Sequence, residues 1–295
     1  PDIKIGVYRS GKGGNNPESL AADITFKDPY SAISWEPDAA IIASPATFHF
    51  SHSINFIRKG IPLLIEKPLD SDSNEFHLWQ NINKDLKNKI LIGYLLRHDP
   101  AFKKIKTWIK EIKIGTIKKA YMKNVSWLPD WRPSINYKNS VSAKVNLGGG
   151  ILLEQSHDID LAKSLFGNLK VDKAIVSNSK LLDIEVEDRA NISFLNQENI
   201  PINIEISFCN KNIQRSLYIE GSEGSIKWDI KSGTLSLKER EFLYKESFNI
   251  DANERIRIQF QHFINVCNKE DIPLVCLEDS LDTLRLIREI RKFKK

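Results

Sequence analysis

The stretch Ile61-Pro-Leu-Leu-Ile-Glu66-Lys67-Pro68-Leu69 joins an apolar run of strand length to a charged pair and a proline. An unbroken apolar run is typical of a strand that is buried on both faces, as in a parallel sheet. Ligands of open α/β sheets bind at the carboxyl ends of such strands, where Lys67 would stand. A lysine there can hold a substrate hydroxyl and exchange its proton. An ordinary solvated turn explains the same residues and stays open at this point.

Further apolar runs surround this stretch, and helical patterns separate them. The runs lie at 3–8, 24–26, 39–44 and 90–94, and the helical patterns lie at 28–34, 47–59 and 74–86. This alternation predicts right-handed βαβ units and a doubly wound parallel sheet. We place this first domain at residues 1–96.

The second part of the chain, residues 97–295, follows a different pattern. Helices are expected at 99–112, 151–166, 252–268 and 277–292, and strands at 117–125, 174–178, 189–194, 202–208, 216–220, 225–229 and 234–238. Gly221 and Gly224 mark a hairpin among these strands. The pattern predicts an α+β domain with one large, open, mainly antiparallel sheet backed by helices.

Composition limits the classes of function. The 295 residues contain 41% hydrophobic and 27% charged residues, which is typical of a globular protein. No run reaches the roughly 18 apolar residues of a membrane span, and no secretion signal opens the chain. Cys209, Cys267 and Cys276 lack metal or redox spacing. We therefore expect a cytoplasmic protein with no metal site and no membrane partner.

The net charge of +5 needs no nucleic-acid partner, because the basic residues mostly follow helical patterns and no nucleic-acid-binding module is recognisable. A modest positive field also suits an anionic substrate or cofactor.

A glycine-rich helix start carries the second candidate site, Gly148-Gly149-Gly150-Ile-Leu-Leu-Glu154-Gln-Ser-His157-Asp-Ile-Asp160. Glycines let a backbone approach another group closely. His157 would share a helix face with Glu154 and Asp160, and a neighbouring carboxylate can orient an imidazole as a base near neutral pH. A histidine paired with a local carboxylate near a helix start is the alternative.

A third segment places Ser44 and Pro45 at the end of a buried strand, followed by His49 and His52 on a helix. Ser44 and Pro45 would therefore face a ring-shaped ligand at the sheet edge. We assign His52 to the helix surface.

These segments, in this order and together with Gly93-Tyr94-Leu-Leu-Arg97-His98-Asp-Pro100, resemble the glucose-fructose oxidoreductase / inositol dehydrogenase / MocA (Gfo/Idh/MocA) family over nearly the whole chain. The loop Leu128-Pro-Asp-Trp131-Arg132-Pro-Ser-Ile-Asn-Tyr137 is similar to a subgroup linked to bacterial surface-polysaccharide and nonulosonic-acid sugars.

The resemblance implies a Rossmann-type domain that binds NADP or NAD, and a second domain that binds a sugar, polyol or nucleotide-sugar. Lys67 and His157 would form the catalytic pair. Residues implied to line the nicotinamide–ribose region, besides Lys67, are Ser44, Pro45, His49 and Glu66. Candidate substrate contacts are Tyr94, Arg97, Arg132, Tyr137, Lys144, Glu154 and Asp160. Trp127 and Trp131 are candidates for stacking on a sugar or for the core.

The sequence departs from the family at two places. Many members carry an aspartate four residues before the histidine, where Leu153 stands, and Glu154 follows one residue later. The family also begins with a strand and a Gly-x-Gly-x-x-Gly turn that binds the pyrophosphate. Gly11-Lys-Gly13-Gly14 lacks the third glycine of that pattern.

The run 3–8 therefore corresponds to the second Rossmann strand, so that the first strand, phosphate loop and helix are expected to be missing. Residue 1 is proline and the single methionine is Met122, which agrees with this interpretation. Arg9 and Ser10 then stand where the ribose is bound, and an arginine there favours the 2′-phosphate of NADP; a solvated loop arginine is the alternative.

The leading functional hypothesis is hydride transfer at a sugar carbinol by a homodimer or homotetramer that pairs through the open sheet. Two alternatives remain. Relatives use transient oxidation for sugar elimination or hydrolysis, and a non-catalytic sugar-binding protein would need no nucleotide site.

Overall fold

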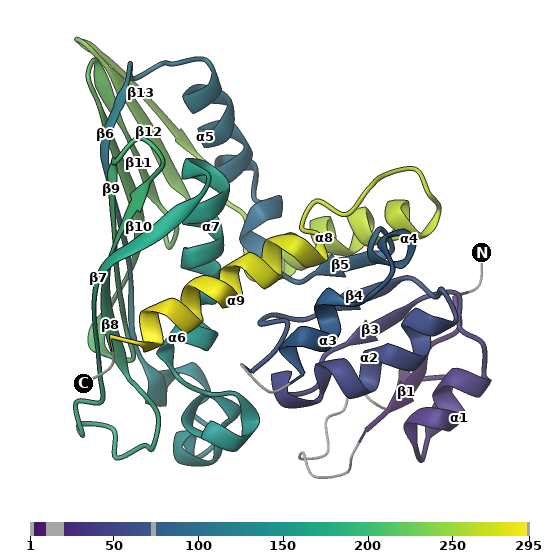
Figure 1. The fold of residues 1–295 in the computed structure, drawn as a ribbon. Coiled ribbons are helices and arrows are strands. Elements are labelled where there is room, and N and C mark those ends of the chain that lie inside the picture. Colours follow the sequence, from purple (N-terminus) through teal and green to yellow (C-terminus); the bar gives the residue numbers. More distant parts are fainter. Residues whose placement is uncertain (1–2, 10–20, 72–74, 294–295) are drawn as a thin grey trace.

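The computed structural model describes residues 3–9, 21–71 and 75–293. A small parallel layer precedes a large, mainly antiparallel sheet, so the predicted fold class is confirmed (Figure 1). Helices lie between the two layers and cover one face of the large sheet. The carboxyl ends of the parallel strands therefore approach the helices of the second part of the chain.

The parallel layer consists of two groups of strands. β1 (Gly6–Tyr8) pairs with β2 (Ile24–Phe26), and β3 (Ala40–Ile42), β4 (Leu63–Ile65) and β5 (Ile90–Ile92) form the other group. Every pairing is parallel, as the unbroken apolar runs predict. Within the described residues no strand pairs with the second edge of β1 or of β3. The expected absence of a strand between the two groups stays a prediction, since residues 10–20 lie outside the described ranges.

Four α-helices accompany these strands within the described residues. They are α1 (Pro29–Ser34), α2 (His49–Arg58), α3 (Phe76–Gln80) and α4 (Lys84–Lys87). The single helix expected at 74–86 is wrong, because the chain turns at 81–83 and Asn83 caps a separate short helix through its side chain. The fully buried Trp79 anchors α3 in the core.

The large sheet has the order β13-β12-β11-β10-β6-β9-β8-β7. Its strands are β6 (Ile117–Trp127), β7 (Leu169–Ser177), β8 (Arg189–Asn196), β9 (Pro201–Ser207), β10 (Cys209–Gly221), β11 (Gly224–Asp229), β12 (Thr234–Glu239) and β13 (Phe242–Ser247). Among the described strands of this sheet, only β6 and β9 pair in parallel. The predicted hairpin at Gly221 and Gly224 joins β10 to β11. The sequence pattern missed β13, an edge strand whose residues are half-buried or exposed.

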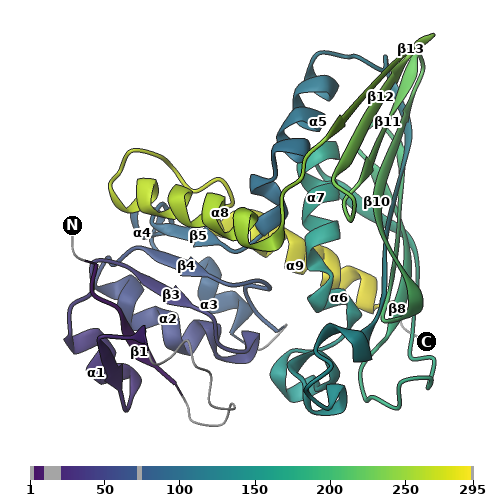
Figure 2. The same ribbon diagram turned by 180° about the vertical axis from the view of Figure 1, so that it is seen from behind.

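Helices cover one face of this sheet and leave the other face open (Figures 1 and 2). These helices include α5 (Pro100–Lys110), α6 (Ile151–Glu154), α7 (Ser156–Phe166) and α9 (Leu277–Arg291). The helix expected at 151–166 is thus two helices with a break at Gln155. Apolar side chains alternate along the strands and face the helices, for example Ile202, Ile204 and Ile206 of β9, all of which are buried.

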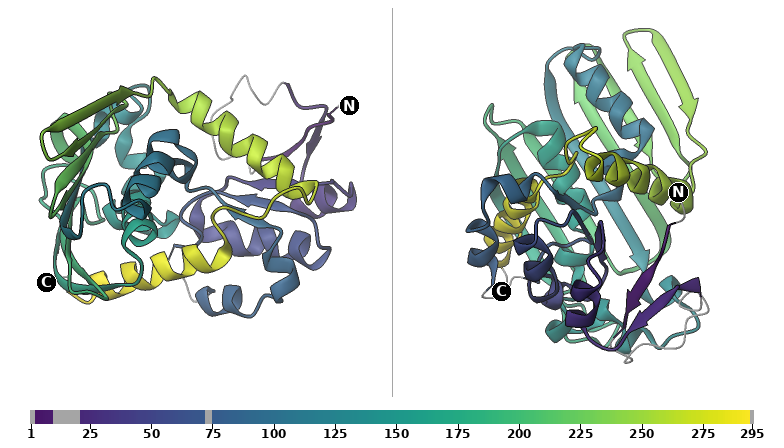
Figure 3. Two further views of the ribbon diagram at one scale, coloured as in Figure 1. Left: turned by 90° about the horizontal axis from the view of Figure 1, so that it is seen from above. Right: turned by 90° about the vertical axis from the view of Figure 1, so that its right-hand side faces the viewer.

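The C-terminal helices link the two layers. α8 (Ala252–Cys267) is followed by a segment in which the Val275 carbonyl accepts a hydrogen bond from the Ile92 backbone at 3.0 Å. α9 then runs from the parallel layer to the far part of the large sheet (Figure 3). The domain boundary at residues 96 and 97 stays a proposal, because α9 contacts both β5 and β7.

Gly150 is the N-cap residue of α6, and a substitution there tests how closely the start of this helix packs against Glu187. Its φ is +108°, and a Cβ atom there would lie 2.6 Å from Glu187 Oε1. Gly167 also has a positive φ, +77°, but has no atom within 4 Å of that position. Gly150→Ala should therefore lower the free energy of unfolding by about 1–3 kcal/mol more than Gly167→Ala, because only the first adds overlap to backbone strain. Urea denaturation measures both, and equal losses would contradict the packing argument.

Candidate active site

Lys67 leaves the carboxyl end of β4 and crosses to the second part of the chain. Its Nζ donates to the Glu154 backbone carbonyl at 2.9 Å and lies 3.3 Å from Glu154 Oε2. Both side chains are mostly buried, with 18% of Lys67 and 17% of Glu154 exposed. The Lys67–Pro68 peptide bond is cis, and Pro68 is buried. The ammonium group is therefore fixed at the end of α6.

The break between α6 and α7 makes this carbonyl available. In a continuous helix the Glu154 carbonyl would accept the backbone N–H of Asp158. Here the Asp158 N–H donates to Gln155 at 3.1 Å instead. The Glu154 carbonyl thus belongs to the unsatisfied end of α6, and the Lys67 ammonium stabilises it as a cation at a helix C-terminus.

Glu66 packs against the next strand. A Cβ atom on Gly93 would lie 2.9 Å from Glu66 Oε2 and 3.1 Å from its Cα, so only glycine allows the two strand ends to approach this closely. Burial raises the pKa of Glu66, although Lys67 opposes the shift through its backbone N–H and its charge. Glu66 is therefore a half-buried carboxyl beside the lysine.

His157 lies in the first turn of α7 with its ring edge-on to Tyr94, at 5.5 Å between ring centroids. Its Nδ1 is buried and has no hydrogen-bond partner among the described residues. Burial lowers the pKa of His157 well below the usual value, and the positive charges of Lys67 and Arg215 lower it further. The imidazole is therefore neutral at pH 7 and can accept a proton.

Arg215 of β10 is a neighbour of His157 that the motif analysis missed. Arg215 Nη2 lies 3.4 Å from Asp158 Oδ2, and Asn124 Nδ2 donates to the same oxygen at 2.8 Å. Asp158 is fully buried, whereas a quarter of the Arg215 side chain is exposed. Side chains on a strand alternate between its two faces, so Arg215 shares a face with the buried Leu217 and Ile219. This alternation is the one sequence signal that could have indicated that Arg215 faces inward.

Ser44, Pro45 and His52 gather at the end of β3. Ser44 and Pro45 are half-buried, and Ser44 Oγ lies 3.0 Å from His52 Nδ1. Phe48 stacks on His52 at 5.7 Å between ring centroids, and the ring of Tyr8 lies edge-on at 6.2 Å. His52 is thus a half-buried residue of α2, and its assignment to the helix surface instead of the site stays a prediction.

His49 is 1% exposed, which corrects its expected place in the cofactor lining. Its Nε2 lies 2.7 Å from the Ser44 carbonyl and its Nδ1 lies 3.3 Å from the Leu69 carbonyl. His49 thus links the segments that follow β3 and β4 and has no surface for a ligand to contact.

Tyr94, Arg97 and Asp160 are interior residues, so their expected substrate contacts are also corrected. Tyr94 is 0% exposed, and burial raises the pKa of its phenol. Arg97 Nη1 lies 3.4 Å from Asp160 Oδ1, with 9% and 1% of the two side chains exposed. Burial raises the pKa of Asp160 to about 7 against the opposing charge of Arg97. The sequence motif indicates that polar residues occupy these positions. It does not indicate whether their side chains face the core or a ligand.

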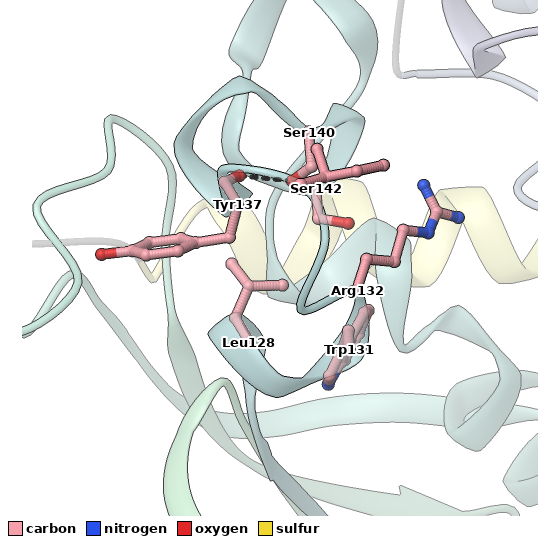
Figure 4. Close-up of a pocket in the computed structure, with 7 residues that line it drawn as sticks. Leu128, Trp131, Arg132, Tyr137, Ser140 and Ser142 are labelled. Carbon is pink, nitrogen blue, oxygen red and sulfur yellow. Dashed lines mark hydrogen bonds between the residues drawn. The ribbon is translucent and has the colours of Figure 1, made fainter. Parts of the chain in front are cut away.

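The segment after β6 forms short 3-10 turns around a small pocket (Figure 4). Arg132 is exposed and points away from Tyr137, which lies on the other side of the pocket. The Tyr137 hydroxyl donates to the Leu182 carbonyl at 3.0 Å, so this hydroxyl anchors the loop. Trp131 packs edge-on against Phe208 and donates to Ser126 Oγ at 3.0 Å. Lys144 is half-buried, and it and Arg132 stay candidate substrate contacts.

The remaining cofactor candidates stand near β1. Arg9 is exposed and directly follows β1, whereas Ser10 lies outside the described residues, as do Gly11, Gly13 and Gly14. No trio of His, Cys, Asp or Glu in the described part of the chain is arranged to hold a metal ion. None of the described helices combines the length and apolarity required to span a membrane.

Comparison with known proteins identifies the family. Residues 6–94 match the model described as "Oxidoreductase family, NAD-binding Rossmann fold", and residues 102–227 match the GFO/IDH/MocA C-terminal domain. The two models follow each other in the order of the two layers and together cover most of the chain. The chain therefore belongs to the Gfo/Idh/MocA oxidoreductase family, as its motifs predict.

Similar curated proteins include inositol dehydrogenases. Inositol 2-dehydrogenase of Rhizobium meliloti is 28% identical over 44% of this chain and 37% of that protein. scyllo-Inositol 2-dehydrogenase (NAD(+)) of Bacillus subtilis is 28% identical over 56% of this chain and 46% of that protein. The chain thus matches less than half the length of either relative.

Solved structures share the fold over almost the full chain. Levoglucosan dehydrogenase in complex with NADH and levoglucosan has a TM-score of 0.83 and 17% identity, with 99% of this chain and 89% of that chain covered. KijD10, a 3-ketoreductase from Actinomadura kijaniata solved with NADP, has a TM-score of 0.78 and 16% identity, with 94% and 85% covered. At these identities the likeness shows the fold alone.

The electrostatic coupling between Lys67 and His157 can be measured without turnover. Lys67→Met removes a positive charge that lowers the pKa of His157, so this pKa should rise towards 6.5. NMR titration of the isotope-labelled imidazole measures the shift. Lys59→Met, which removes an exposed lysine paired with Glu36, is the matched control and should leave the His157 titration unchanged. A titration of His157 that Lys67→Met does not move would place the two groups too far apart to share a hydroxyl.

Proposed function

We propose that the protein is an NAD(P)-dependent oxidoreductase that transfers a hydride between the nicotinamide and a hydroxyl-bearing carbon of a sugar, polyol or nucleotide-sugar. Lys67 and His157 are its catalytic pair. One observation carries the proposal. The Lys67 ammonium is held by Glu154, three residues before His157 in the sequence, and its charge acts on the neutral His157 imidazole. The similarity of the chain to inositol dehydrogenases and to levoglucosan dehydrogenase supports the proposal.

The residues at the carboxyl ends of β3 and β4 suit the nicotinamide end of a dinucleotide. Pro45 offers a half-buried apolar surface, and Lys67 and Glu66 offer polar groups beside it. Such an edge of an open α/β sheet is where dinucleotides bind. When bound there, the nicotinamide would accept or return the hydride. Gly11, Gly13 and Gly14 lie outside the described residues, so the fit proposed here concerns the nicotinamide end.

Each of the chain's own groups has a distinct task in this proposal. His157 takes the hydroxyl proton during oxidation, which its neutral state allows. Lys67 donates a hydrogen bond to the same oxygen and stabilises negative charge there. Glu154 holds the ammonium in place through its carbonyl and carboxylate. Tyr94 packs against the imidazole and limits its orientation.

The proposed cofactor is NADP in preference to NAD, because Arg9 follows β1 where an arginine can bind the 2′-phosphate. The resemblance in fold to a 3-ketoreductase solved with NADP agrees with this preference, and the levoglucosan dehydrogenase solved with NADH keeps NAD as the alternative.

Substitution of Lys67 tests the catalytic pair. Lys67→Met should lower turnover roughly a hundredfold or more, because the hydrogen bond and the charge stabilisation at the substrate oxygen are both lost while His157 remains. Reduction of NADP⁺ or NAD⁺ with inositols and levoglucosan is followed by absorbance, and Lys59→Met is again the control. Wild-type turnover in Lys67→Met would refute the role of the lysine. Sugar conversion without net reduced cofactor would instead favour transient oxidation.

The open face of the large sheet supports the proposal of a homodimer or homotetramer. Outward side chains of β7, β8, β9 and β6 line a shallow groove on this face. Ile175 is 69% exposed and Tyr121 is 41% exposed within it. Apolar groups on an uncovered sheet face are stabilised when a second copy covers them.

Ile175→Glu should therefore weaken self-association, because it places a charge in the contact. Leu181→Glu is the matched control, since Leu181 is 62% exposed but lies in the loop after β7. Sedimentation equilibrium measures both variants. A wild-type chain that is monomeric, or association that Ile175→Glu leaves unchanged, would contradict pairing through this face.

A further inference from the structure

The inner face of the large sheet changes from apolar to polar as it approaches His157. Inward positions along β6 are Ala120, Met122, Asn124 and Ser126, and along β10 they are Ile219, Leu217 and Arg215. The apolar members of both series are fully buried under the helices. The polar members therefore mark the part of the inner face that lies next to the candidate site and not under the apolar core.

Arg215 is held in this position from two elements. It pairs with Asn124 in the register of β10 and β6, so the two side chains leave the same face side by side. Asn124 Nδ2 and Arg215 Nη2 both point to Asp158 Oδ2, at 2.8 and 3.4 Å. Asn124 Nδ2 also donates to Gln155 Oε1 at 2.6 Å. This network fixes the guanidinium against the start of α7, one residue from His157.

The protein does not use all the donors of Arg215. A guanidinium has five N–H donors, and the contact to Asp158 is a single long one. Arg215 Nε is buried without a hydrogen-bond partner among the described residues, and the exposed quarter of the side chain belongs to its other atoms. The Lys67 ammonium, in contrast, is matched by Glu154. The Lys67 ammonium uses two of its three donors in this way, whereas Arg215 uses one of five, so most of its donors are left for a ligand.

We propose that Arg215 binds an anionic substituent of the substrate, a carboxylate or a phosphate, and that the enzyme selects acidic sugars over neutral ones. Rigid guanidinium donors match the two oxygens of such a group, and charge-assisted hydrogen bonds are about twice as strong as neutral ones. The proposal rests on the proposed function, because it takes the space beside Lys67 and His157 as the substrate site. Burial of the neighbouring groups strengthens the preference for acidic over neutral sugars, because solvent screens an ion pair between Arg215 and the substrate only weakly.

The location beside His157 also explains how the anion would be oriented. The positive charges of Arg215 and Lys67 both act on the His157 imidazole, and Lys67 and Arg215 contact Glu154 and Asp158, which lie three residues before and one residue after His157. A sugar held by its acidic group at Arg215 would present a ring hydroxyl to Lys67 and His157. Two anchors at different points of the ring fix the reacting carbon more tightly than one.

Binding of matched acid and ester probes tests the proposal on the unaltered chain. D-Glucuronate and D-galacturonate are compared with their methyl esters by calorimetry, with and without NADP⁺, and D-glucose 6-phosphate is compared with D-glucose. The anionic member of a pair should bind roughly tenfold or more tightly, because only it forms the charge-assisted contact. Tighter binding of the uronates identifies a carboxylate site, and tighter binding of the phosphate identifies a phosphate site.

Variants of Arg215 locate the effect. Arg215→Gln should abolish the preference for the anionic probe, and Arg215→Lys should retain part of it by charge alone. Arg240→Gln is the matched control, because Arg240 is 78% exposed and pairs with Glu223 on the β10–β11 turn. The acid and ester comparison stands even if a variant fails to fold, since it uses the unaltered protein.

The outcomes separate this inference from the proposed function. Equal affinity for each anionic and neutral pair, no binding by any of the anionic probes, or a preference that Arg215→Gln retains would overturn the anion site. If the anionic probes bind more tightly through Arg215 but no oxidation or reduction of the cofactor occurs, the anion site stands and the oxidoreductase proposal fails.

Discussion

The contact between the Lys67 ammonium and the end of α6 is the interaction on which the rest of the site depends. It joins the parallel layer to the helices that line the large sheet, and it does so with a backbone carbonyl as well as a carboxylate. A carbonyl cannot change rotamer, so the position of the ammonium is tied to the helix break at Gln155. The geometry of the centre is therefore set by backbone as much as by side chains.

Burial and nearby positive charges explain the neutral state of the histidine. Two cations, Lys67 and Arg215, act on His157, and each has its own buried or half-buried carboxylate, Glu154 and Asp158. Burial lowers the pKa of His157 most and the two cations lower it further, while the carboxylates are directed to the cations and not to the imidazole, which is therefore neutral. A neutral base between two donors suits removal of a hydroxyl proton while the resulting oxygen stays stabilised.

The fold, and the places of Lys67 after a strand and of His157 on a helix, were predictable because their signals are local. An apolar run that ends in Glu66-Lys67-Pro68 defines a strand and its carboxyl end, and the glycine-rich start places His157 on a helix. Arg215, the break at Gln155 and the burial of Tyr94 depend on which strands and helices meet, and pattern analysis of one segment contains no such information. The same limit explains why Arg97 and Asp160 were assigned to the substrate although they pair inside the core.

The departure at Leu153 has a structural meaning. In an unbroken helix a carboxylate four residues before His157 would share its helix face, but here position 153 lies on α6 and His157 on α7. Leu153 is 1% exposed and belongs to the core, so a carboxylate there would need a buried partner. Glu154, one residue later, is directed instead to Lys67, and the broken helix gives the ammonium a second acceptor beside it. With the carboxylate at position 154, the group that it contacts is the Lys67 ammonium and not the His157 imidazole. Tyr94 is then the residue that orients the imidazole.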